Sequence, residues 1–202
     1  IRRSFIFAVL GLAMLAISNP KPVQAEGSAV KAEEFIAGLA DEAIQALTMP
    51  NISRDEREKR FRDMLHKNFA IKTIARWVLG RHWKKATKEQ RDEYMHLFEE
   101  LLVVTYVDRF TQYSGENLKI VKSLANNPKD AMVFSEIVRQ GTQPVHVDWR
   151  VRTSDSTTFK IIDVMVEGVS MGQTQRSEFA SVIRQNGGKV EGLLAVLRKR
   201  VS

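Results

Sequence analysis

The segment from Phe159 to Phe179, FKIIDVMVEGVSMGQTQRSEF, constrains the fold more than any other part of the sequence. Its first half is a β-branched run that is apolar on both faces of an extended strand: Ile161, Ile162, Val164 and Val166. Such a strand must be covered on both faces, either by protein or by a bound apolar molecule. Gly168 is expected to end the strand, and Gly172 offers a second turn before an arginine-bearing segment leads into a helix.

The first 25 residues have the features of a cleaved secretory signal. Arg2 and Arg3 precede an uncharged apolar run from Phe5 to Ile17, which is shorter than the ~20 apolar residues needed to cross a bilayer. Val23-Gln24-Ala25 supplies small residues at the positions that a signal peptidase reads. We therefore expect residues 1–25 to be removed and residues 26–202 to form a single domain. The alternative is an uncleaved N-terminal anchor.

Charge and cysteine content exclude several classes of function. Removal of Arg2, Arg3 and Lys21 lowers the formal net charge from +7 to +4. So small a surplus, with acidic and basic residues interspersed, indicates a solvated surface and argues against nucleic-acid binding. The sequence has no cysteine, which excludes disulfides, thiolate metal sites and thiol nucleophiles. An exported domain of this kind must be held together by packing alone.

Periodicity predicts a helical front half followed by a sheet. Helices are expected at 26–49, 53–65, 69–80 and 87–110, two of them opened by capping-box patterns at Ser53 and Thr87. The run Leu101–Val107 is apolar nearly all round, so we expect it to be buried on more than one side. Alternation with a period of two predicts strands at 116–122, 132–138, 145–151 and 159–166, joined by short turns.

These elements predict an α+β fold with a curved four-stranded antiparallel sheet. Short turns between successive strands imply a meander. Two helices, Phe179–Ile183 and Glu191–Arg200, are expected to pack back onto the sheet and to enclose an apolar cavity with it.

A series of short motifs runs from about Phe69 to Leu197: Val78-Leu79-Gly80, Trp83, Asp163-Val164, Gly168-Val169-Ser170, Arg176, Phe179, Gly188 and Gly192-Leu193-Leu194. Their order and spacing resemble the MlaC family of periplasmic lipid-binding proteins, also called toluene-tolerance auxiliary proteins. The sequence departs from the family at Phe159, where the family often has Trp, and at Met171–Gln175, which replaces a more apolar link.

The resemblance implies a soluble periplasmic carrier that maintains outer-membrane lipid asymmetry. Such a carrier holds a phospholipid by its acyl chains and shuttles it between an outer-membrane lipoprotein-porin complex and an inner-membrane ABC transporter complex. It has no catalytic residues, metal or cofactor, and the phospholipid is its cargo. One branch of the same family transports hopanoids, and this alternative stays open.

The candidate lipid-binding residues are apolar positions on the long helix and on the last two long strands. They are Phe98, Leu101, Val147, Trp149, Val151, Ile162, Val164, Val166 and Val169. The alternative is that these side chains simply pack against helices. At the polar end, Arg76 and Arg176 are candidates for headgroup binding, because the planar guanidinium binds two phosphate oxygens. They have an alternative structural role, in which one of them pairs with Asp163.

A rival hypothesis is an enzyme. Asp163 interrupts an apolar strand, which makes it either a buried structural acceptor or a catalytic base, with His146 as its nearest candidate partner. The four histidines show no metal-ligand spacing. The sequence also lacks the pattern of a nucleophile elbow or a phosphate loop.

The export hypothesis is testable directly. We expect the mature protein to be recovered from the periplasm with Glu26 as its first residue, because the apolar run is too short to serve as an anchor. N-terminal sequencing is the measurement. A recovered chain that still carries Arg2 and Arg3 would contradict the prediction.

Overall fold

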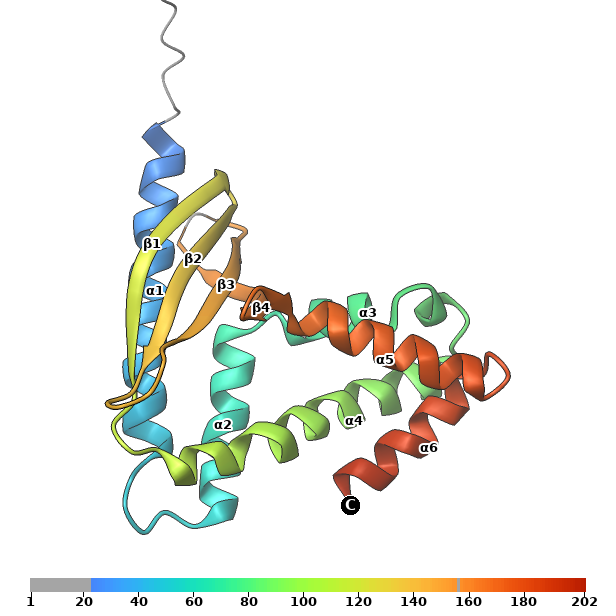
Figure 1. The fold of residues 1–202 in the computed structure, drawn as a ribbon. Helices are drawn as coiled ribbons and strands as arrows, with labels where there is room; N and C mark the ends of the chain where they lie inside the picture. Colours follow the sequence, from blue (N-terminus) through green and yellow to red (C-terminus); the bar gives the residue numbers. More distant parts are fainter. Residues whose placement is uncertain (1–22, 156) are drawn as a thin grey trace, which may run out of the picture.

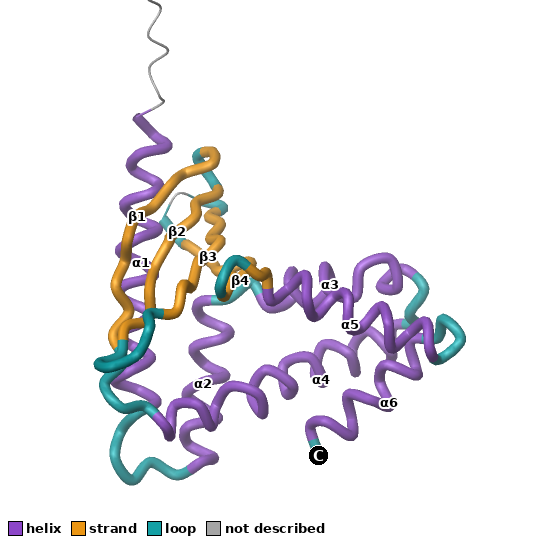
Figure 2. The backbone as a smooth tube through the Cα atoms, viewed as in Figure 1, coloured by secondary structure: helices purple, strands orange, loops and turns teal. Residues whose placement is uncertain are grey.

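The computed structural model describes residues 23–155 and 157–202, so most of the predicted signal segment lies outside the described residues. One end of the molecule is an antiparallel sheet packed along a long helix, and a group of helices extends away from this sheet (Figure 1). Figure 2 shows the same division, with the strands beside α1 at one end and helices α3 to α6 at the other. The α+β fold class predicted from the sequence is confirmed.

The described residues form six α-helices and two short 3-10 helices. The α-helices are α1 (Val23–Leu47), α2 (Arg54–Asn68), α3 (Ile71–Leu79), α4 (Lys88–Tyr106), α5 (Met171–Gln185) and α6 (Val190–Val201), and the 3-10 helices are η1 (Gly80–Lys84) and η2 (Val107–Gln112). None of the helices within these described residues is both long enough and apolar enough to cross a membrane.

The sheet is an antiparallel meander, as predicted. Its strands follow chain order: β1 (Asn117–Asn127), β2 (Asp130–Val138), β3 (Val145–Thr153), β4 (Phe159–Val166) and β5 (Val169–Ser170). The prediction of four strands was wrong by one, because the chain folds back after β4 and pairs again. Glu167 and Gly168 both have positive φ, 50° and 75°, which is the geometry of a tight hairpin turn.

One face of the sheet is apolar and packs against the helices. Trp149 lies opposite both Val133 and Val164, so these three side chains form one row across the sheet. The next row is fully buried: Ala131, Val151 and Ile161. We call these two rows the inner sheet face. Helix α1 packs along the β1 and β2 side of the sheet (Figure 1), where the Ser123 hydroxyl donates to Glu33 over 2.9 Å.

The edge strand β1 is irregular. Its pairing with β2 shifts register between Ile120 and Lys122 and again between Ala125 and Asn127. A register shift bends a strand and increases its twist. Beyond the first shift, Val121 and Leu124 are about half exposed, at 53% and 51%.

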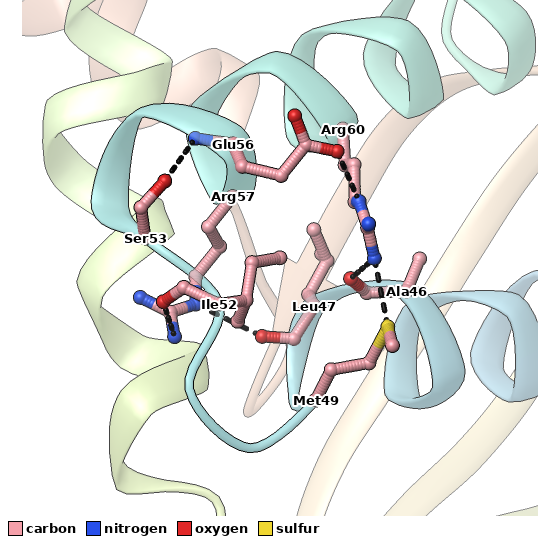
Figure 3. Close-up of polar contacts among 8 residues, drawn as sticks. All are labelled: Ala46, Leu47, Met49, Ile52, Ser53, Glu56, Arg57 and Arg60. Atoms are coloured by element: carbon pink, nitrogen blue, oxygen red, sulfur yellow. Dashed lines mark hydrogen bonds and ion pairs between the residues drawn. The ribbon is translucent and has the colours of Figure 1, made fainter.

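The connection between α1 and α2 is fixed by two arginines (Figure 3). Arg57 donates to the carbonyl oxygen of Leu47 over 2.9 Å, and Arg60 donates to that of Ala46 over 3.1 Å. These are carbonyl groups of the last turn of α1, which have no partner inside their own helix. Ser53 caps the start of α2 as predicted, but the capping box expected there is incomplete, because the Glu56 carboxylate accepts from Arg60 instead.

The helical end has its own aromatic core. Tyr94 and Phe98 of α4 pack against Phe179 of α5, with ring centroids 5.8–6.4 Å apart. The Tyr94 side chain is fully buried, and its hydroxyl donates to the carbonyl oxygen of Ala75 in α3 over 2.9 Å. Helix α6 adds three fully buried leucines, which are Leu193, Leu194 and Leu197. The predicted burial around 101–107 is confirmed at Leu101, Val103 and Val107.

Helix α5 begins earlier than predicted, at Met171 and not at Phe179. Gly172, expected to form a turn, lies in the first turn of this helix. The reason is the cap: the Ser170 hydroxyl oxygen accepts from the backbone N–H of Gln173 over 3.0 Å. A serine cap starts a helix wherever the following backbone N–H groups find acceptors, even in a polar segment.

The sheet joins the helical end at β4. The backbone N–H of Ala70, between α2 and α3, donates to the carbonyl oxygen of Ile161 over 2.9 Å. Phe69 and Ile161 form an isolated parallel bridge at the same point. The edge of β4 is therefore closed by backbone from the helical half of the chain and by β5.

Two glycines in helices should respond oppositely to alanine. At Gly192 in α6, an added Cβ would overlap with the Cβ of Asn186 and lie 2.5 Å from its Cγ. We expect Gly192→Ala to lower the free energy of unfolding by about 1–3 kcal/mol, as overpacking does. At Gly38 in α1, an added Cβ meets no atom within 4 Å. Gly38→Ala should therefore raise the free energy of unfolding by about 0.5–1 kcal/mol. Urea denaturation measures both, and a stabilising Gly192→Ala would refute the packing argument.

Candidate functional site

A hollow of about 830 Å³ lies on the helical end of the molecule. Its volume is within the range of ordinary ligand sites. The lining residues all come from α3, η1, α4 and α5: Lys72, Thr73, Arg76, Trp77, Gly80, Trp83, Lys84, Asp92, Met95 and Arg176. We call it the basic hollow. It brings together Arg76 and Arg176, the two arginines named from the sequence for the polar end.

Arg176 is held in place at one side of the basic hollow. Its guanidinium donates to the carbonyl oxygen of Trp77 over 2.9 Å and lies 5.0 Å from the centroid of the Trp77 ring. Helix α3 ends here, at Gly80 with φ of 57°. A Cβ on Gly80 would lie 3.1 Å from the Arg176 Cζ atom. Glycine therefore serves two needs at this position, a positive φ and the close approach of the guanidinium.

Asp163 holds the start of α5 against β4. One carboxylate oxygen accepts from the Ser170 hydroxyl over 2.6 Å, and the other accepts from the backbone N–H of Gly172 over 3.2 Å. A Cβ on Gly172 would lie 3.0 Å from Trp77 and 3.1 Å from Asp163. We call Asp163, Ser170, Gly172 and Trp77 the Asp163 cluster. The carboxylate accepts from a hydroxyl and a turn amide in this cluster, while Arg176 bonds elsewhere.

Positive charge is concentrated around the basic hollow. Residues 72–91 contain seven lysines and arginines and a single acidic residue, Glu89. The rest of residues 26–202 carries 21 basic and 23 acidic side chains, so the surplus of the mature chain resides in this segment. The expectation of interspersed charge was therefore wrong here. The reason is local: three of these seven cations, on α3 and η1, line the same hollow.

The same electrostatic environment acts on His82 in η1. Burial lowers the pKa of His82, and the neighbouring cations Arg81, Lys85 and Arg184 lower it further. The protonated form is thus disfavoured both by desolvation and by like charges.

Two tryptophans form the apolar part of the lining. Trp77 is 43% exposed, which is unusual for so large an apolar side chain. Trp83 is half-buried, and the guanidinium groups of Arg76 and Arg91 lie 5.7 and 5.4 Å from its ring centroid. Cation–π contacts of this kind orient an arginine without neutralising its charge.

The predicted lipid-binding residues lie outside this hollow, in three environments. Four are buried, namely Phe98, Leu101, Val147 and Val151. Four are half-buried, namely Trp149, Ile162, Val164 and Val166. Val169 is 53% exposed in β5. Phe98 is fully engaged in the aromatic core, so the alternative of ordinary packing describes its contacts. As lipid contacts, all nine stay predictions.

Trp149 and Val164 are the pair of greatest interest among these. They are directly opposite on neighbouring strands, and both remain half-buried although they adjoin the core. The Trp149 indole N–H donates to the Ser135 hydroxyl oxygen over 3.0 Å, which fixes the ring on the inner sheet face.

The candidate catalytic pair is not brought together. Asp163 lies opposite Arg150 on β3, whereas the backbone of His146 bonds to Glu167 at the far end of the same strand. Four residues of extended strand separate 146 from 150, which is about 13 Å. In residues 23–155 and 157–202, no group of three or more His, Cys, Asp or Glu side chains is arranged to hold a metal ion.

Reasoning from the sequence missed four of the residues that shape the basic hollow, which are Lys72, Trp77, Trp83 and Lys84. A signal was present in the charge pattern of 72–91. Averaging the charge over the whole mature chain concealed it.

Comparison with known proteins shows the family of this chain. The profile of one family, described as MlaC protein, matches residues 38–199. The chain belongs to the MlaC family. The match extends the resemblance noted from Phe69 onward back into α1.

Three relatives illustrate the similarity. The chain is 26% identical over 129 residues to the "Intermembrane phospholipid transport system binding protein MlaC" of Haemophilus influenzae, covering 62% of this chain and 59% of that protein. It is 22% identical over 108 residues to the "Toluene tolerance protein ttg2D" of Pseudomonas putida, covering 54% and 50%. A solved structure of a phospholipid-binding protein from Ralstonia solanacearum, in complex with a phospholipid, has a TM-score of 0.76 at 23% identity. That likeness covers 84% of this chain and 96% of the other, and it shows the shared fold.

The chain thus spans between half and three fifths of the curated relatives' lengths.

Two glycines of the MlaC-family pattern have a steric reason in this structure. Gly80 admits the Arg176 guanidinium, and Gly192 admits the side chain of Asn186.

The Asp163 cluster predicts a stability effect without an effect on cargo. We expect Asp163→Asn to lower the free energy of unfolding by about 1–2 kcal/mol, because two charge-assisted bonds at the start of α5 weaken. The matched control is Asp148→Asn, on the same face of the neighbouring strand, for which we expect a negligible change. Urea denaturation and the lipid content of the folded protein are the measurements. Equal stability of the two variants would exclude this role, and loss of a measurable hydrolytic activity in Asp163→Asn would favour an enzyme.

Proposed function

We propose that this protein is a periplasmic carrier that holds a phospholipid by its acyl chains. It passes the lipid between an inner-membrane ABC transporter complex and an outer-membrane lipoprotein-porin complex. The observation that carries the proposal is membership of the MlaC family. Its Haemophilus influenzae relative is named as the binding protein of an intermembrane phospholipid transport system. The Pseudomonas putida relative bears the name of a toluene tolerance protein.

The inner sheet face supplies a surface suited to acyl chains. Trp149, Val164 and Val166 are apolar and half-buried, and they adjoin each other on β3 and β4. The Trp149 indole N–H donates to the Ser135 hydroxyl oxygen, so Trp149 would present only its apolar ring to an acyl chain. An acyl chain needs an apolar lining with few polar groups, which these positions would provide.

The energetics favour handover between apolar sites over release into water. Two acyl chains bring roughly 30 methylenes, worth about 24 kcal/mol against water at ~0.8 kcal/mol each. Extraction from a bilayer moves the chains from one apolar environment to another, so most of this free energy cancels. Transfer is therefore reversible while loss to water is not. Such a carrier needs no catalytic group, which fits the separation of Asp163 from His146 along the sheet.

Val164→Trp tests the proposal at the inner sheet face. Trp149 lies directly opposite, so the substitution adds bulk where a chain would lie. We expect the variant to lose its bound phospholipid and to retain a melting temperature near that of the wild type. Native mass spectrometry and mass spectrometry of a lipid extract measure the cargo. The extract also distinguishes a phospholipid from a hopanoid.

The control is Leu124→Trp, which adds a similar ring at a 51% exposed position on β1 and should leave the cargo unchanged. If the inner sheet face is ordinary core, Val164→Trp instead costs roughly 1–3 kcal/mol in strain. A large drop in melting temperature with lipid still bound would place the chains elsewhere. A wild-type protein purified without any lipid would count against the carrier role itself.

A further inference from the structure

We propose that the basic hollow binds the oxyanion of a phosphate or phosphate ester, held by Arg76 and Arg176 together with Lys72 and Lys84. This goes beyond the proposed function, because a carrier that grips acyl chains needs no site for the phosphate. The basic hollow also lies apart from the surface proposed for the acyl chains. The lining comes from α3, η1, α4 and α5, whereas Trp149 and Val164 belong to β3 and β4.

The first argument is that these cations lack carboxylate partners. Elsewhere in the molecule, arginines form two-bonded pairs with acids: Arg62 with Glu100, Arg152 with Asp130 and Arg198 with Glu93. Among the residues that the structure describes, no carboxylate lies within 4.0 Å of a charged nitrogen of Lys72, Arg76, Lys84 or Arg176.

The acidic side chain of the lining does not offset this charge. Asp92 pairs with Lys88 on its own helix over 2.7 Å. Four cations thus line one hollow, and the carboxylate of its lining, Asp92, is already paired with Lys88. Clustered like charges disfavour one another, so a bound anion would relieve the repulsion.

The second argument is that the arginines are positioned in advance. One nitrogen of Arg176 is fixed by the Trp77 carbonyl, and Gly80 leaves room for the group. Arg76 is oriented over the Trp83 ring. A planar guanidinium binds two oxygens of a phosphate at once, and little side-chain freedom remains to be lost on binding.

The third argument concerns the rest of the ligand. Trp77 and Trp83 give the hollow apolar walls next to its cations. Exposed indole rings suit a ligand that is charged at one end and apolar at the other. A phosphate ester on a glycerol or short alkyl stem has this chemistry, and inorganic phosphate has its charged half.

The three tryptophans of the chain give a site-resolved assay. Trp77 and Trp83 line the basic hollow, whereas Trp149 lies on the sheet, so their indole N–H signals in a ¹H–¹⁵N spectrum report on different places. Single Trp→Phe variants assign the three signals. Potassium phosphate is titrated into the purified full-length protein, with potassium chloride at matched ionic strength as the reference.

We expect phosphate to shift the Trp77 and Trp83 signals saturably and to leave Trp149 unmoved. Arg76→Gln and Lys84→Gln should each weaken the binding about tenfold, as loss of a charge-assisted bond does. Neither of these side chains donates a hydrogen bond to another described residue, so the variants should fold normally. The matched control is Lys119→Gln on the exposed edge strand β1, which should bind as the wild type does. The site is refuted if chloride reproduces the shifts, or if Lys119→Gln weakens binding as much as Arg76→Gln.

Two short-chain lipids identify the source of the oxyanion. Dihexanoylphosphatidylglycerol and dihexanoylglycerol, both below their micelle concentrations, differ by the phosphate-bearing headgroup. If the Trp77 and Trp83 signals shift with dihexanoylphosphatidylglycerol but not with dihexanoylglycerol, the site binds a lipid headgroup. Shifts with potassium phosphate but with neither lipid assign it to free phosphate, and no shift with any of the three overturns the inference. A Trp149 shift with dihexanoylglycerol tests the acyl-chain proposal separately, so the two can fail independently.

Discussion

The carboxylate of Asp163 joins the sheet to the helical end of the molecule. It accepts from Ser170 and from the first turn of α5, where Gly172 lies close to both Asp163 and Trp77. Because α5 then runs along α3, this contact sets where Arg176 meets the end of α3, and hence the shape of the basic hollow. Together with the Phe69–Ile161 bridge, this carboxylate therefore positions the two halves of the protein.

Much of the fold follows from periodicity and capping. The apolar patterns of 145–151 and 159–166 were sufficient to predict the two strands and their place as neighbours in an antiparallel meander. The register that sets Trp149 opposite Val164 comes from the structure. The Thr87 capping box was equally reliable, since all its hydrogen bonds are local and both form in the structure.

What the sequence did not reveal depends on contacts between distant segments. The early start of α5 requires Asp163 as an acceptor for Gly172, and a helical pattern alone cannot show this. The basic hollow depends on Arg176 reaching Trp77, which lies 99 residues earlier in the chain. Arg76 and Arg176 were identifiable as phosphate-type side chains of one polar end, but the lysines and tryptophans that surround them were not, because their common location is a product of helix packing. Whether acyl chains replace packing at the inner sheet face depends on a cargo that the sequence does not encode.

The irregular edge of the sheet has a consequence for how copies of this protein behave together. A straight, flat edge strand is a template on which another chain can add and start an aggregate. The two register shifts in β1 interrupt the ladder of free backbone groups, and the exposed Lys119 and Lys122 repel the same strand of a second copy. At the other edge, β4 is already occupied by β5 and Ala70. The protein, whose inner sheet face keeps half-buried apolar positions at Trp149 and Val164, is thus protected against polymerising through the edges of that sheet.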